Sequence, residues 1–105
     1  MRKELTQIRR RLFYLPDRDA SANQVISLTA RATEILKRYR KSLQQQAFPT
    51  NLDLTISQLE ANLSEMEHYR ELHGPRRKEH FLHSHRQNVW SDLSAYLNSN
   101  QQVSF

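Results

Sequence analysis

Apolar residues recur every three or four positions along most of the chain, and this spacing limits the fold more than any other feature of the sequence. Positions spaced in this way fall on one face of an α-helix, so each helix presents an apolar stripe that has to be buried. Four segments show the spacing, and turn-forming residues separate them. No segment shows the alternation of β-branched residues that predicts a strand. The pattern therefore predicts an all-α fold.

Proline and glycine set the limits of the expected helices. Proline disfavours helical geometry in the residue before it, so Pro16 and Pro49 end the first two helices, and Gly74 with Pro75 ends the third. We expect helices over residues 3–15, 20–46, 51–72 and 76–98. The stripe residues are Leu5, Ile8, Leu12 and Leu15; Val25, Leu28, Ala32, Ile35, Leu36, Tyr39 and Leu43; Leu52, Ile56, Leu59, Leu63 and Met66; and Phe81, Leu82, Val89, Leu93, Tyr96 and Leu97, with Trp90 at the margin.

Four amphipathic helices joined by short loops predict an up-down-up-down four-helix bundle, with a shorter first helix. The chain has 105 residues, which suffices for one core and leaves no room for a second. We expect one domain over residues 1–98 and a flexible C-terminal tail over residues 99–105, where the sequence is polar. The free chain is expected to be a monomer, with a helical oligomerisation module as an alternative.

The composition disfavours most kinds of catalytic or cofactor site. The chain has no Cys and one Gly, which excludes thiolate metal sites, cysteine nucleophiles and glycine-rich phosphate loops. His80, His83 and His85 lie close in sequence, but on a helix the third lies about 140° from the first, so they do not converge on one ion. No run approaches the roughly 20 apolar residues of a membrane span. We therefore expect no enzyme activity, cofactor, metal or small-molecule substrate.

Charge is divided unevenly along a chain whose formal net charge is +5. Residues 50–72 hold five carboxylates and one arginine, whereas basic residues cluster at 9–11, 37–41 and 76–78. One interpretation is solvated faces with ion pairs from the acidic third helix. The alternative function is a basic helical module that binds nucleic acid. Tyr39 argues against a base-stacking role for residues 37–41, because it lies on the apolar stripe.

Four short strings occur in a particular order along the chain. They are Leu15-Pro16-Asp17, Arg38-Tyr39-Arg40-Lys41, His68-Tyr69 and Gly74-Pro75-Arg76-Arg77-Lys78. Their order and separation resemble the small luminal photosystem II assembly factor family, the eleven-kilodalton photosystem II protein of cyanobacteria and chloroplasts, over residues 3–97. The chain departs from the cyanobacterial members, which carry a lipid on an N-terminal Cys, because it has no Cys, and it is more basic than the family.

The resemblance implies a four-helix bundle without catalytic activity, peripheral to the membrane in the thylakoid lumen. Members of the family bind the lumenal side of the photosystem II inner antenna protein during assembly and repair. On this reading, partner-binding candidates are Arg38, Arg40, His68 and Tyr69. The alternative reading is that these four residues stabilise the ends of the bundle through hydrogen bonds and packing.

Overall fold

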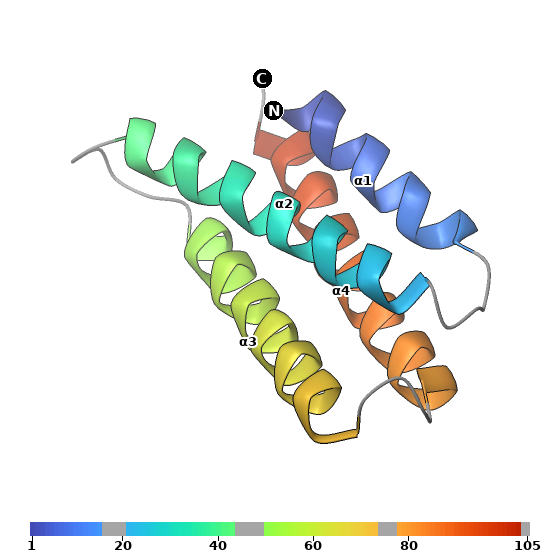
Figure 1. Ribbon diagram of the computed structural model, residues 1–105. Helices are drawn as coiled ribbons and strands as arrows, with labels where there is room; N and C mark the ends of the chain where they lie inside the picture. The colour runs from blue at the N-terminus through green and yellow to red at the C-terminus, as the bar shows by residue number, and fades with distance from the viewer. Residues whose placement is uncertain (16–20, 44–49, 74–77, 104–105) are drawn as a thin grey trace.

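The computed structural model describes four α-helices, which are shown in Figure 1. They are α1 (Arg2–Tyr14), α2 (Ser21–Ser42), α3 (Thr50–His73) and α4 (Lys78–Val103). The backbone is described over residues 1–15, 21–43, 50–73 and 78–103, and the side chains over residues 1–15, 23–43, 51–70 and 84–98. These ranges contain no strand. The predicted all-α fold is confirmed, and α1 is the shortest helix, with 13 residues.

Two helix ends differ from expectation by several residues: α2 ends at Ser42, before the expected end at residue 46, and α4 ends later than expected. The helix α4 continues past the expected end at Asn98 to Val103, because the residues between contain neither glycine nor proline to end it. At the end of α1, Leu15 has φ −63° and ψ 133°, the extended geometry that a following proline favours. The predicted turn residues Pro16, Pro49, Gly74 and Pro75 lie outside the described residues.

The helices α2 and α3 run antiparallel, as contacts between opposite ends show. Arg40 at the end of α2 meets Asp53 at the start of α3, whereas Arg70 near the end of α3 meets Asn23 near the start of α2. The helices α1 and α4 also lie side by side and antiparallel, since Arg2 donates to the carbonyl of Leu97. Figure 1 shows the alternating directions. The molecule is elongated, 45 × 24 × 16 Å.

The apolar stripes meet in one core, as the spacing predicts. Leu15, Tyr39, Leu43, Leu63 and Tyr69 are only partly buried and pack against its edges, and the side chains of Phe81 and Leu82 lie outside the described residues. The core residues are Leu5, Ile8, Leu12, Val25, Ile26, Leu28, Ala32, Ile35, Leu36, Leu52, Ile56, Leu59, Met66, Val89, Leu93, Tyr96 and Leu97. Every described stripe residue is therefore buried or partly buried.

Three buried threonines widen the buried faces of α2 and α3. The hydroxyls of Thr29 and Thr33 each donate to the carbonyl four residues earlier at 2.7 Å, and Thr55 does the same at 2.6 Å. A buried hydroxyl is costly unless it is hydrogen-bonded, and this local bond satisfies it without a partner on another helix. The helix α2 can therefore bury more than one stripe, and it contacts each of the other three helices.

Candidate functional site on the outer faces of the bundle

The basic string at the end of α2 is largely ion-paired. The guanidinium of Arg38 lies 2.6 Å from the carboxylate of Glu34 on the same helix, and that of Arg40 lies 2.7 Å from Asp53 on α3. Lys37 lies 2.8 Å from Glu60, also on α3. The two pairs that reach α3 support the interpretation that the acidic third helix neutralises its neighbour, and all three pairs reduce the positive charge available here for phosphate groups.

The structure does not bring the four predicted contact residues together. His68 is exposed and Tyr69 is half-buried against the core, both toward the end of α3. Arg40 is paired at the start of α3, with Asp53, and the rise of a helix separates Asp53 from His68 by about 22 Å. Arg38 and Arg40 therefore form one pair of candidates and His68 with Tyr69 another, at opposite ends of the α2/α3 hairpin.

Polar side chains from α3 and α4 meet in a partly buried cluster, which we call the α3/α4 polar cluster. Its members are Asn62, Glu65, His85 and Asp92. Asn62 lies at its centre: its side-chain oxygen is 3.1 Å from Nδ1 of His85, and its amide nitrogen donates to Asp92 at 3.4 Å. Nε2 of His85 lies 3.8 Å from the carboxylate of Glu65. The cluster joins the two helices through side chains that have to find one another, so it fixes their register.

Burial shifts the pKa values of His85 and Asp92, two titratable residues of this cluster, in opposite directions. Desolvation lowers the pKa of His85 below its ordinary value, and the nearby carboxylate of Glu65 acts in the opposite sense with a smaller effect. Desolvation raises the pKa of Asp92 above its ordinary value. In both cases burial disfavours the charged form. Both groups are therefore more readily neutral than on an open helix face.

The histidines do not form a metal site within the described residues. The side chains of His80 and His83 lie outside them, and among the side chains that are described no three His, Asp or Glu residues gather closely enough to hold a metal ion. Within the same residues, no helix is both long and apolar enough to cross a membrane.

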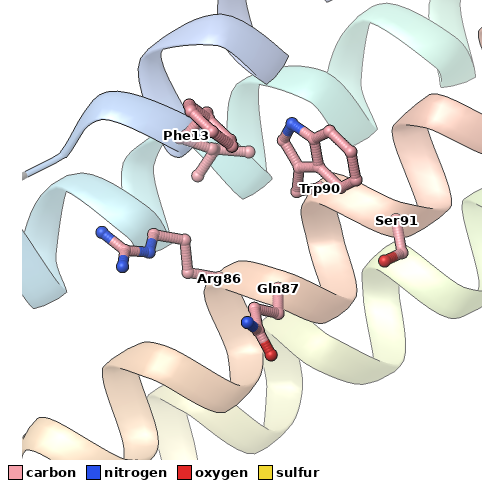
Figure 2. A pocket seen from close by; sticks show the side chains of 6 residues that line it. Phe13, Arg86, Gln87, Trp90 and Ser91 are labelled. Carbon is pink, nitrogen blue, oxygen red and sulfur yellow. The ribbon is translucent and has the colours of Figure 1, made fainter.

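A pocket of about 300 Å³ opens between α1 and α4, and we call it the α1/α4 pocket. Figure 2 shows Phe13 projecting from α1 toward the ring of Trp90 on α4. Along α4 the wall combines the ring of Trp90 with the polar side chains of Gln87 and Ser91. The lining residues are Leu12, Phe13, Arg86, Gln87, Trp90 and Ser91.

Aromatic side chains on this face are unusually open to solvent. Phe13 is 61% exposed and Tyr14 is 70% exposed, and their rings meet edge to face with centroids 5.0 Å apart. Trp90 lies 6.1 Å from the ring of Phe13, tilted by 43°. Contiguous exposed aromatic surface is typical of a binding site rather than of a plain solvated face.

Arginines surround this aromatic group. Arg86 donates to the carbonyl of Leu15 just after α1, which places a cation at a helix C-terminus and ties α1 to α4. Arg9 and Arg10 lie about one turn before Phe13 on α1, whereas Arg11 lies on the side of α1 that faces α2, beside Ser27 and Arg31. None of the three is ion-paired with a described carboxylate. The face formed by α1 and α4 is thus both aromatic and basic.

Sequence reasoning did not find this pocket, although the chain carries a signal for it. Phe13 and Tyr14 are large aromatic residues off the stripe formed by Leu5, Ile8 and Leu12, so the helical pattern itself exposes them. Trp90 lies at the margin of its own stripe. Their meeting depends on the packing of α1 against α4, which no local pattern specifies.

No family model matches the chain, and no match is found among curated proteins or solved structures. What the structure defines is an all-α bundle of four helices with a packed interior and an aromatic, basic face on α1 and α4.

Proposed function

We propose that this chain is a non-catalytic assembly and repair factor of photosystem II that binds the lumenal side of the inner antenna protein. The proposal comes from the family resemblance, and the four-helix architecture that the resemblance implies supports it. Two of the resembling strings lie near helix ends: Arg38 to Lys41 near the end of α2, and His68 with Tyr69 in the last turns of α3.

The observation that carries the proposal is the contrast between a tightly filled apolar core and a surface with exposed aromatic and basic side chains. Among the described residues, seventeen apolar side chains fill the core, while Phe13 and Tyr14 are exposed near Arg9 and Arg10, which have no described ion-pair partner. A rigid bundle of this kind acts by presenting side chains to a partner, through shape and charge complementarity. Its role would be to occupy an acidic lumenal surface while the photosystem is assembled.

Nucleic-acid binding is the second candidate function, and one observation favours it. Arg9, Arg10 and Arg11 have no described ion-pair partner, and Arg9 and Arg10 lie one helical turn from the exposed ring of Phe13, on which a base could stack. The other described basic cluster weakens this candidate, because Lys37, Arg38 and Arg40 are all paired with carboxylates. The contiguous basic track that follows a phosphate backbone is therefore interrupted.

A pull-down separates the two candidates. The tagged chain, immobilised and incubated with a detergent extract of thylakoids, is expected to retain the inner antenna protein with modest sensitivity to salt. Nucleic-acid binding instead predicts an affinity for RNA or DNA whose logarithm falls steeply with the logarithm of salt concentration. Retention of no antenna or reaction-centre subunit would count against the first proposal.

A further inference from the structure

We propose that the α1/α4 pocket receives one apolar side chain, aromatic or leucine, from an acidic segment of a partner protein. The inference rests on the proposed function only in assuming that the chain works by binding a protein. It adds the place of contact, which lies away from Arg38, Arg40, His68 and Tyr69, and the chemistry of the segment that binds there.

The α1/α4 pocket is small and its lining is largely apolar. Four large apolar residues are exposed in the described part of the chain; one of them, Phe13, lines the pocket, and a second, Tyr14, meets the ring of Phe13. Leu12 and Trp90 complete the apolar lining. A volume of about 300 Å³ is at the small end for ligand sites, and it suits a single side chain. Buried anchors of this kind carry most of the binding energy of an interface.

The charge around the pocket selects an acidic segment. Arg9 and Arg10 lie four and three residues before Phe13, so they flank it one turn away on the same helix. Neither is ion-paired with a described carboxylate, and none of the described residues that line the pocket is a carboxylate. Aspartate or glutamate next to the anchor would therefore meet positive charge on the α1 side, whereas lysine or arginine there would be repelled.

The geometry of the rings favours a peptide over a nucleic-acid base. A base held between two aromatic rings needs nearly parallel faces about 7 Å apart or more, but Phe13 and Trp90 are tilted by 43° with centroids 6.1 Å apart. A side chain that packs against ring edges fits this arrangement. Gln87 and Ser91 on the α4 wall offer hydrogen-bonding groups for the backbone of an extended peptide.

The chain carries its own reporter, because Trp90 is its single tryptophan. The probe is a short synthetic peptide without tryptophan, in which a central phenylalanine is flanked by aspartate and glutamate. Titrated into the full chain, it is expected to change the emission of Trp90 saturably. Replacing the central phenylalanine by alanine, or the acidic residues by lysine, is expected to weaken binding by about tenfold or more.

Matched variants locate the contact, with affinities measured by calorimetry because Phe13 itself touches Trp90. Phe13→Ala is expected to weaken peptide binding by about tenfold or more, and Arg10→Glu by several fold, increasingly at low salt. Leu54→Ala removes another exposed apolar side chain, and Lys3→Glu makes the same charge change elsewhere on α1. Both controls are expected to bind as the parent does. All four sites are exposed, so the fold is preserved.

Equal binding by Phe13→Ala and the parent, or no saturable change at Trp90, would overturn the proposal. So would single-stranded RNA that binds more tightly than the peptide and depends on Phe13. If the parent chain retains the antenna protein in the pull-down but does not bind the peptide, the pocket is not the contact site and the proposed function still stands. If the chain binds the peptide as predicted but retains no antenna protein, the pocket is a binding site and its partner is not the photosystem II antenna protein.

Discussion

Replacing Leu59 by alanine tests the placement of the core most sharply. Leu59 is fully buried (0% exposed) on α3, so its truncation removes buried methyl groups and leaves a cavity between helices. Such changes reduce the free energy of unfolding by about 2 to 5 kcal/mol, a large part of the 5 to 15 kcal/mol that holds a typical domain together. In a chain of this size, the melting temperature is expected to fall by roughly 10 °C or more.

The same helix supplies a matched control. Leu54 is 58% exposed, and Leu54→Ala makes the same chemical change five residues earlier on α3. Little packing is lost there, so the expected change in the free energy of unfolding is within about 0.5 kcal/mol. The half-buried Leu63 is expected to fall between the two. Urea denaturation followed by far-ultraviolet circular dichroism measures all three, and a Leu59→Ala curve that superimposes on the parent would refute the placement of this face in the core.

Three further predictions concern polar contacts. A double-mutant cycle of Arg40→Ala and Asp53→Ala is expected to give a coupling below about 1 kcal/mol that shrinks in high salt, since both groups are partly exposed; coupling of several kcal/mol would show a buried bridge instead. Burial holds the pKa of His85 below its ordinary 6.5. As the pH falls through 6.5, the unfolded chain therefore binds more protons at this residue than the folded chain does. Stability is then lost, and His85→Gln is expected to reduce that loss; an identical pH profile would contradict this. Burial raises the pKa of Asp92 above 3.8, so Asp92→Asn is expected to stabilise the fold at neutral pH, with a gain that vanishes as the pH falls toward 3.8. A thermal midpoint lowered at neutral pH would mean that its carboxylate is needed.

The sequence predicted the helices and most of the core because these depend on local spacing. The stripe from Leu52 to Met66 is one example: a period of three and four residues is a property of the helix itself. The predicted end of α4 at Asn98 was wrong, because local polarity does not specify where a helix stops. Polarity after Asn98 predicts exposure, but polar residues without glycine or proline do not by themselves end a helix.

The candidate site was predicted less well because it depends on how helices meet. Asn62 and Asp92 each lie three and four residues from buried stripe positions, which places them at a helix interface, yet only the packing of α3 against α4 shows that they pair. Phe13 and Trp90 are far apart in sequence and are brought together by α1 and α4. The four residues taken from the family resemblance share no single surface, which short strings of sequence do not reveal.

The most direct test of the account compares antenna retention by two single variants in the same thylakoid pull-down. Phe13→Ala and Leu54→Ala each remove one exposed apolar side chain, and only the first alters the α1/α4 pocket. The account predicts that the parent and Leu54→Ala retain the inner antenna protein equally, while Phe13→Ala loses most of it. Equal retention by both variants, or none by the parent, would contradict it.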